Sequence, residues 1–296
     1  MSRLRKVFFA LLMIATPFAL YGFFFLVARK PVNDALIAAV KRDDLTAVQS
    51  LLARGANINS RDGTRFMSCT DARPPRTLET PLRLSMFGLG PFRAARSWRG
   101  PRDATLMNYL LERGADVNIG NSEGTTPLHL AAVWGDVSLA KKLLAHGANV
   151  NATDNSGQTP LSEAAYQDHL SVVKLLLAHG ADVNIGRGYY RPVLMAIGYR
   201  NNISVLKELV AHGADVNARG WRGDTALHNA AEYGRSEGIE ILLKNGADAT
   251  IRDNDGKTPR MCITGYGNNF WGPNKAQRAA ALRDSIQKLL SEAEAN

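Results

Sequence analysis

The sequence is poor in the residues and motifs on which catalysis and covalent cross-linking depend. It has only two cysteines, Cys69 and Cys262, and no CxxC pair, so neither a cysteine zinc site nor a thiol redox motif is indicated. It also lacks an HExxH motif and a phosphate-binding Walker loop. We therefore expect a non-enzymatic protein without a cofactor and without a bound metal.

One glycine recurs at a fixed spacing through most of the chain. Gly114, Gly147, Gly180, Gly213 and Gly246 are 33 residues apart, and each belongs to a phrase such as LLAHGADVN. A second phrase, such as TPLHLAA, begins twelve residues after the glycine. The threonine and proline suit the start of a first helix, and the glycine suits the left-handed end of a second helix. A fixed period of this size predicts stacked supersecondary units in place of one globular core.

These two phrases resemble the signatures of the ankyrin repeat family over roughly residues 33–260. The resemblance implies an all-α solenoid of about seven stacked helix-turn-helix units with projecting finger loops, an architecture used to bind other proteins. A helical-hairpin array of another type is the alternative.

The repeat domain is expected to cover residues 33–296, in seven units of unequal regularity. We place the units at 33–60, 61–118, 119–151, 152–184, 185–217, 218–250 and 251–296. The first lacks the TPLH phrase and the last degenerates into a helix over roughly residues 274–295, as expected of capping units. The second unit is stretched by inserts at 64–76 and 88–103, and such inserts form loops.

The two cysteines are not expected to form a disulfide. Cys69 belongs to the second unit and Cys262 to the seventh. Helices that stack at roughly 8–10 Å separate these units by far more than the roughly 7 Å between Cα atoms that a disulfide allows. We expect Cys262 to be a packing residue and Cys69, in the insert, to be a free thiol.

The histidines are expected to be structural. His146, His179 and His212 occupy one slot in successive units, which disperses them too widely to bind a single zinc ion. His129 and His228 belong to the TPLH phrase, where the resemblance implies that the ring bridges backbone groups of adjacent repeats.

The first thirty residues differ from the repeats. A basic tip at residues 1–6 precedes residues 7–28, a run of 22 residues without a charge. As a helix this run would span about 33 Å, enough for a hydrocarbon core of roughly 30 Å. Cleaved signal peptides have a shorter apolar stretch and a small-x-small cleavage site, which is poor here. We therefore expect an uncleaved transmembrane signal-anchor helix at 7–28, with a cleaved signal peptide as the alternative.

The basic residues that flank this run predict its orientation. Arg3, Arg5 and Lys6 outnumber Arg29 and Lys30, which favours an amino terminus in the cytoplasm. We therefore expect a single-pass membrane protein of a bacterial inner membrane with its repeats in the periplasm. Repeats that face the cytoplasm are the alternative.

The net charge of +9 is concentrated outside the regular repeats. Residues 1–30 hold five basic residues and no acidic ones, and residues 61–105 hold nine arginines against four acidic residues. A nucleic-acid binder carries its basic stripe along the domain itself, so we expect no nucleic-acid partner. Anionic lipid headgroups are the nearer candidate partner of the arginine-rich insert, and a solvated loop is the alternative.

The resemblance also implies which slots contact a partner: the finger tips and the residues that follow the first helix. Carried over residue by residue, these slots hold tyrosine, tryptophan and arginine, the types enriched at binding hot spots. The candidate residues are Tyr189, Arg191, Tyr199, Arg200, Trp221, Arg222, Tyr233, Trp134 and Tyr166. Isolated exposed aromatic residues are common, so packing between helices is the alternative.

The fifth unit departs from the pattern. Pro192 stands in the threonine slot, so we expect no side-chain cap on its first helix. Tyr190 replaces the finger glycine that the neighbouring units have, and tyrosine adopts a positive φ only at a cost. This finger is therefore expected to take another shape, which leaves the directions of Tyr189 and Arg191 open.

Together these features favour a membrane-tethered ankyrin scaffold that binds an unidentified protein partner on its concave, finger-lined face. A regulatory or inhibitory subunit of an envelope enzyme or transporter is the alternative function.

Overall fold

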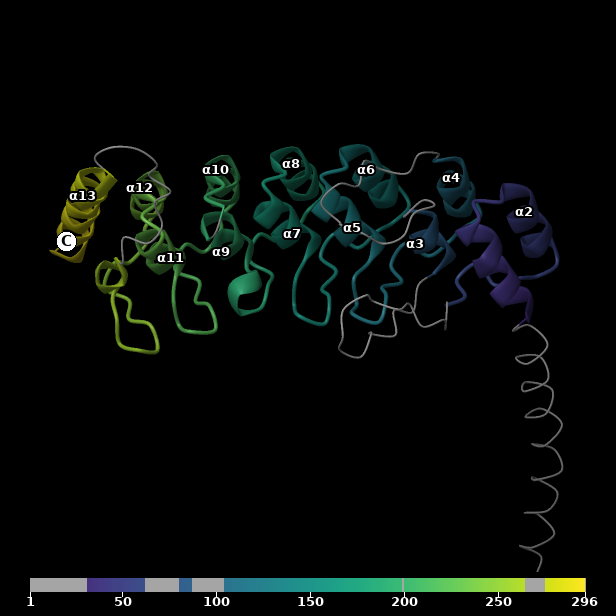
Figure 1. Cartoon of the computed structure of the whole chain (residues 1–296), viewed down its shortest axis with the longest axis horizontal. Coiled ribbons are helices and arrows are strands. Elements are labelled where there is room, and N and C mark those ends of the chain that lie inside the picture. The colour runs from purple at the N-terminus through teal and green to yellow at the C-terminus, as the bar shows by residue number, and fades with distance from the viewer. Residues whose placement is uncertain (1–30, 62–79, 87–103, 199, 264–274, 296) are drawn as a thin grey trace, which may run out of the picture. The chain divides into compact units, whose positions relative to one another are not determined.

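The computed structural model describes residues 31–61, 80–86, 104–198, 200–263 and 275–295, and every regular element in them is helical (Figure 1). The chain divides into two compact units, Met1–Asp116 and Val117–Asn296. Each has its own buried apolar side chains.

The first unit is built from a helix over residues 31–41 and from α2 (Leu45–Ala53), α3 (Pro81–Ser85) and α4 (Thr105–Glu112). The Asp44 carboxylate caps α2 by accepting a hydrogen bond from the Ala47 amide at 2.9 Å. Its core includes Leu36, Val48 and Leu110, whose side chains are fully buried. The two inserts, 64–76 and 88–103, lie outside the described residues, as does Cys69.

The second unit repeats one helix pair. The pairs are α5 (Pro127–Trp134) with α6 (Val137–Ala145), α7 (Pro160–Gln167) with α8 (Leu170–Ala178), α9 (Pro192–Ile197) with α10 (Ile203–Ala211), and α11 (Ala226–Glu232) with α12 (Ser236–Lys244). First helices stack on first helices, α5 on α7, α7 on α9 and α9 on α11, and second helices stack in the same order. A stack of paired helices with loops projecting from one side results (Figure 1).

The last unit closes the stack with different elements. The 3-10 helix η2 (Pro259–Cys262) packs on α11, and α13 (Lys275–Ala295) packs on both α12 and η2. Ile286 and Leu290 of α13 are buried, and Glu294 accepts a hydrogen bond from the Thr258 hydroxyl at 3.0 Å. The helix expected at the end of the chain is therefore present and covers the last apolar face.

The prediction of a fold that begins with a membrane-spanning helix is corrected. Within the described ranges, the helices are either too short or too polar to cross a bilayer. The longest of them, α13, has 21 residues but carries charges such as Asp284 and Lys288. Residues 1–6 and 7–28, for which the basic tip and the transmembrane helix were predicted, lie outside the described residues.

Threonine and histidine together begin the first helices. Thr126 caps α5, and its backbone amide donates to Nδ1 of His129 at 3.2 Å. Nδ1 is therefore an acceptor, which leaves the proton on Nε2, and Nε2 donates to the Gln158 carbonyl of the next repeat at 3.1 Å. His228 makes the same contacts with Thr225 and with the Lys257 carbonyl. The predicted bridging role of these two histidines is confirmed.

An asparagine in each repeat completes the turn of the next. The Asn184 side-chain oxygen accepts from the Asp215 amide at 2.8 Å, and its amide group donates to the Gly213 carbonyl at 3.2 Å. Asn118, Asn151 and Asn217 make the equivalent pairs of bonds. These bonds satisfy backbone groups at the helix ends that have no partner within their own helix.

A second row of polar side chains ties the interhelical loops to the preceding repeat. His169 Nε2 hydrogen-bonds to the Val133 carbonyl at 3.1 Å. In the next repeat, the Asn202 amide group donates to the carbonyls of Ala165 and Tyr166 at 2.6 and 3.1 Å. Asn202 is 3% exposed, so both bonds are shielded from water.

The fifth repeat is irregular in the two ways that the sequence predicts. Helix α9 begins at Pro192 without a side-chain cap and has six residues, against eight in α5 and in α7. Its finger contains the 3-10 turn η1 (Gly188–Tyr190), with a positive φ of 55° at Gly188 and not at Tyr190. Tyr190 therefore avoids a positive φ, because in this turn the residue with positive φ is a glycine, which adopts that conformation without strain.

Candidate functional site

The fingers of repeats five and six meet through aromatic rings. The Trp221 ring lies edge-on to Tyr189, with ring centroids 6.1 Å apart, and edge-on to Tyr190, with centroids 5.2 Å apart. A Cβ atom on Gly188 would collide with the indole, so only glycine admits Trp221 here. We call Tyr189, Tyr190 and Trp221 the aromatic cluster.

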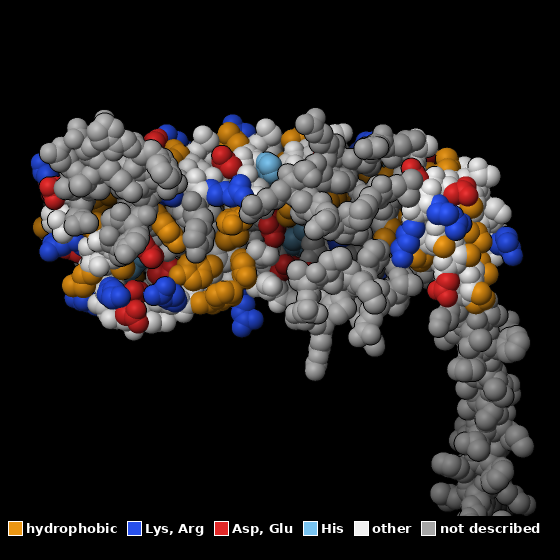
Figure 2. All heavy atoms as spheres, viewed as in Figure 1, with side chains coloured by type: hydrophobic (Ala, Val, Ile, Leu, Met, Phe, Trp, Pro, Cys, Tyr) orange, Lys and Arg blue, Asp and Glu red, His pale blue; other side chains and the backbone are white. Residues whose placement is uncertain are grey.

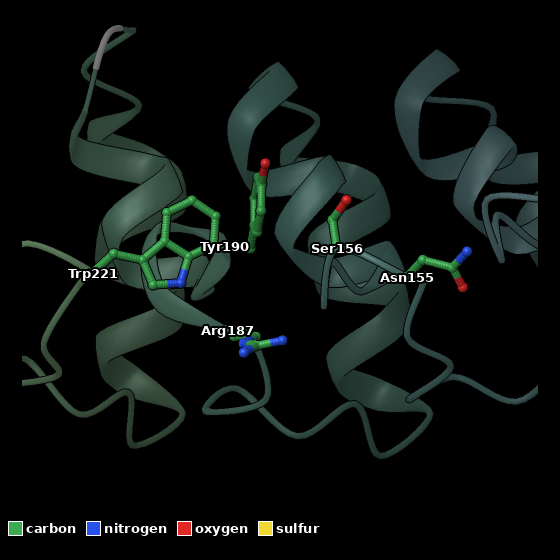
Figure 3. Close-up of a pocket in the computed structure, with 5 residues that line it drawn as sticks. All are labelled: Asn155, Ser156, Arg187, Tyr190 and Trp221. Atoms are coloured by element: carbon green, nitrogen blue, oxygen red, sulfur yellow. The ribbon is translucent and has the colours of Figure 1, made fainter. Parts of the chain in front are cut away.

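An open hollow lies beside this cluster. Its volume is about 270 Å³, and it is lined by Asn155, Ser156, Arg187, Tyr190 and Trp221. Figure 3 shows the Tyr190 ring standing between Trp221 and Ser156, with Arg187 on the lower side. The hollow therefore runs from the finger of repeat four to that of repeat six. Trp221 is 55% exposed, so much of its ring faces solvent.

The candidate arginines are engaged by their own chain. Arg191 donates from a guanidinium NH₂ group to the Asn184 carbonyl at 3.2 Å. Arg222 lies 3.9 Å from the Asp255 carboxylate, which also lies 3.7 Å from Lys257. These ion pairs are exposed to solvent, so they contribute little to stability.

Arginine and tyrosine pair in a second place. The Arg200 guanidinium lies 5.2 Å from the centroid of the Tyr166 ring, a cation–π contact between repeats four and five. Tyr233 makes a contact of the same kind with Arg235 at 5.9 Å.

The structure shows contacts between some of the nine candidate residues. The structure brings Tyr189 and Trp221 together and pairs Tyr166 with Arg200. Trp134 ends α5, three repeats before Trp221 in the stack. Tyr199 lies outside the described residues.

Tyr190 and Arg187 belong to the site but were not among the candidate residues. The signal for Tyr190 was present in the sequence, because it replaces the finger glycine of the other repeats. Its consequence, a turn that places the ring against Trp221, depends on the altered backbone of η1.

Acidic groups surround the Tyr189 hydroxyl. Burial, and next the Asp224 carboxylate, raise the pKa of Tyr189 above its usual value, and Glu232 adds to this. Asp224 is 6% exposed, and neither of its carboxylate oxygens has a hydrogen-bond partner among the described residues. The Tyr189 hydroxyl thus lies beside this carboxylate.

A second acidic group with a shifted pKa lies in repeat four. Burial, and then the nearby charge of Asp154, raise the pKa of Glu163 on α7 from 4.5 to about 7. Its charge state therefore changes near neutral pH.

The other titratable side chains in the described ranges do not form a metal site. No group of three or more histidine, cysteine or acidic residues among them could hold a metal ion. His146, His179 and His212 each bond instead to the carbonyl four residues earlier. Cys262 is half-buried, and this burial raises the pKa of its thiol.

The space-filling view places the exposed apolar atoms on the finger side of the second unit. Figure 2 shows a patch of hydrophobic side chains there, bordered by clustered basic and acidic side chains. Trp221 is an exposed apolar residue of these fingers, and Arg222 follows it in the chain. Arg222 and Lys257 both lie within 4 Å of the Asp255 carboxylate.

Sequence comparisons agree with the geometry of the stack. The family profile described as "Ankyrin repeats (3 copies)" matches residues 92–187, "Ankyrin repeats (many copies)" matches 209–260, and "Ankyrin repeat" matches 33–63 and 191–221.

Curated relatives match part of the chain. The chain is 35% identical to "Zygote-specific protein 3" of Chlamydomonas reinhardtii over 113 residues, which cover 38% of this chain and 23% of that protein. A stretch of 37 residues is 57% identical to "Neurogenic locus notch homolog protein 1" of Homo sapiens, covering 12% of this chain and 1% of that protein. The chain thus spans under a quarter of these relatives' length. Its matches to the repeat profiles nevertheless extend from the first repeat to the seventh, and the chain belongs to the ankyrin repeat family.

Proposed function

We propose that this protein is a non-enzymatic scaffold that binds a protein partner across the fingers of repeats four to six. Ankyrin repeats form protein–protein interaction scaffolds, and nothing in the described residues indicates catalysis. The observation that carries the proposal is Trp221, which is 55% exposed although its ring is held by Tyr189 and Tyr190.

A held but exposed tryptophan suits a binding anchor. Its ring offers a large apolar area, and neighbouring rings already restrict its rotation, so little side-chain entropy is lost on binding. Tryptophan, tyrosine and arginine dominate measured hot spots.

The hollow beside Trp221 supports a macromolecular partner over a small cofactor. Its volume of about 270 Å³ lies at or below the roughly 300–1,000 Å³ of small-molecule pockets. An open hollow of this size accommodates one or two side chains of a partner. Ser156 and Asn155 line it, and the Asn155 amide group donates to the Ser122 carbonyl at 2.9 Å.

The experiment compares partner capture by matched variants. Trp221→Ala should weaken capture by more than about 1 kcal/mol, or roughly fivefold, while stability stays within about 0.5 kcal/mol. Met261→Ala is the control, because Met261 is 61% exposed, belongs to repeat seven and is not a member of the aromatic cluster. Equal capture by Trp221→Ala and the wild type would place the binding surface elsewhere. Equal losses in both variants would indicate non-specific apolar adhesion.

The identity of the captured partner separates the scaffold from the alternative. If the partner is an enzyme or a transporter whose activity changes when the purified repeat protein is added, the protein is a regulatory or inhibitory subunit. If its activity is unchanged, the scaffold proposal stands.

Two further expectations concern the compartment that holds the repeats and the binding of lipid by the arginine-rich insert. The periplasmic location of the repeats stays a prediction, which a compartment-sensitive reporter fused after Asn296 would test. Anionic lipid binding by the arginine-rich insert also stays a prediction, and co-sedimentation with anionic and with neutral liposomes would test it.

A further inference from the structure

Asp224 is a buried carboxylate that makes no ion pair within 4 Å among the described residues. It lies in the finger of repeat six, three residues after Trp221, and is 6% exposed. Neither oxygen has a hydrogen-bond partner among the described residues. Buried carboxylates are normally paired or hydrogen-bonded, because burial removes the water that stabilises their charge. A buried carboxylate without such a partner, in a loop that binds another protein, therefore indicates that the bound protein supplies the missing hydrogen-bond donor or cation.

The backbone leaves room for this side chain. A Cβ atom on Gly220 would lie 2.8 Å from Oδ1 of Asp224, so a side chain at position 220 would displace the carboxylate. The Gly220 amide also donates to the Asp224 carbonyl at 2.7 Å, which fixes the base of the finger. The carboxylate is thus held over a glycine, next to the Tyr189 hydroxyl.

The charges nearby do not supply the missing partner. Tyr189, then Asp255 and more weakly Asp224 raise the pKa of Arg222, and its ion pair is with Asp255 of the next finger, at 3.9 Å. Lys257 also lies against Asp255, at 3.7 Å. Arg191 of the preceding finger bonds to the Asn184 carbonyl. Glu232, which contributes with Asp224 to the raised pKa of Tyr189, makes the surroundings more acidic.

We propose that Asp224 receives a lysine or arginine side chain of the protein partner, whose alkyl stem lies along the Tyr189 and Trp221 rings. The inference rests on the proposed function, because it names the partner's chemistry at the same fingers. A single carboxylate flanked by aromatic edges and faces suits an organic cation, which gains both an ion pair and cation–π contacts. It does not suit a metal ion, which needs several ligands.

Entry of the cation requires one ring to move. The carboxylate oxygens are covered in the free protein, and Tyr189 is the ring whose hydroxyl lies against them. Tyr189 belongs to the 3-10 turn η1, none of whose residues is fully buried, and its ring meets Trp221 edge-on with centroids 6.1 Å apart. A rotation of this ring therefore leaves the stacked helices in place.

The test uses the full-length protein with ¹⁵N-labelled tryptophan. The chain has four tryptophans, and the Trp221 indole signal is assigned from its absence in Trp221→Phe. The probe is a capped peptide of one arginine with two glycines on each side, and the matched control peptide carries neutral citrulline. We expect the arginine peptide to shift the Trp221 signal and the citrulline peptide to bind at least about tenfold more weakly.

Two variants distinguish the site from general electrostatics. Asp224→Asn should reduce arginine-peptide binding to the level of the citrulline peptide. Asp255→Asn makes the same charge change on an exposed carboxylate of the next finger and should alter binding by less than about twofold. Equal effects of the two substitutions, or no effect of Asp224→Asn, would overturn the inference.

Thermal unfolding of the free protein provides an independent check. Because Asp224 has no hydrogen bond to lose, Asp224→Asn should unfold at a temperature no lower than that of the wild type. A lower unfolding temperature would show that the carboxylate is satisfied within the protein and would also refute the inference. If the peptide fails to bind while Trp221→Ala still weakens partner capture, this inference falls and the proposed function stands.

Discussion

Substitution of Gly180 offers a direct measure of what the repeated glycine contributes. Gly180 ends the second helix of repeat four with φ of +81°, and a Cβ atom built on it meets no atom within 4 Å. A substitution there is opposed by backbone strain alone, not by a clash. For residues other than glycine the left-handed conformation costs about 1–2 kcal/mol, and least for asparagine.

We therefore expect Gly180→Val to lower the free energy of unfolding by about 1–2 kcal/mol. Gly180→Asn is the matched control and should cost clearly less, because its short polar side chain tolerates positive φ. Urea unfolding followed by circular dichroism at 222 nm measures both. If Gly180→Val left stability unchanged, or if the asparagine variant were equally destabilised, positive φ would not be the reason for the glycine.

Three further predictions concern other parts of the second unit. Asn202→Ala removes both bonds to the Ala165 and Tyr166 carbonyls and should cost about 1–3 kcal/mol in urea unfolding. Because burial raises the pKa of Glu163 to about 7, its contribution to stability is complete below about pH 4.5 and is lost as pH rises through 7. The stability of the wild type should therefore fall by about 1–3 kcal/mol relative to Glu163→Gln between pH 4.5 and 8, and a constant difference would contradict this. Arg200→Ala removes the cation–π contact with Tyr166 and should weaken partner capture by more than about 1 kcal/mol, with stability measured in parallel; normal capture would exclude this pair from the site.

The helices of the regular repeats could be predicted because local sequence determines them. The threonine caps, the proline after the cap and the terminal glycine each act within one helix, and the structure places Thr126, Pro127 and Gly147 in those roles. The irregular finger of repeat five was also predictable, since Tyr190 cannot adopt the glycine conformation without cost.

The partners of the site side chains could not be predicted in the same way. Arg191 and Arg222 were expected to contact a partner, and this stays a prediction. The sequence did not indicate that Arg191 bonds to the Asn184 carbonyl or that Arg222 pairs with Asp255 of the next finger. Such pairings depend on side-chain rotamers and on the offset between adjacent fingers. The repeat period predicts which residues are neighbours but not which way a flexible arginine turns. The buried state of Asp224 was missed for the same reason.

The asparagine bridges allow whole repeats to be removed or added while the hydrogen bonds between neighbouring repeats are kept. Each bridge joins a residue of one repeat to a residue 29 or 31 positions later, so it needs only the next repeat and not any particular one. Excision of residues 185–217 would place Asp248 where Asp215 now stands, and Asn184 would meet an equivalent backbone amide. Gain or loss of a whole unit by recombination within the gene would therefore preserve these bonds, whereas loss of a single residue would break the register of every bridge that spans it.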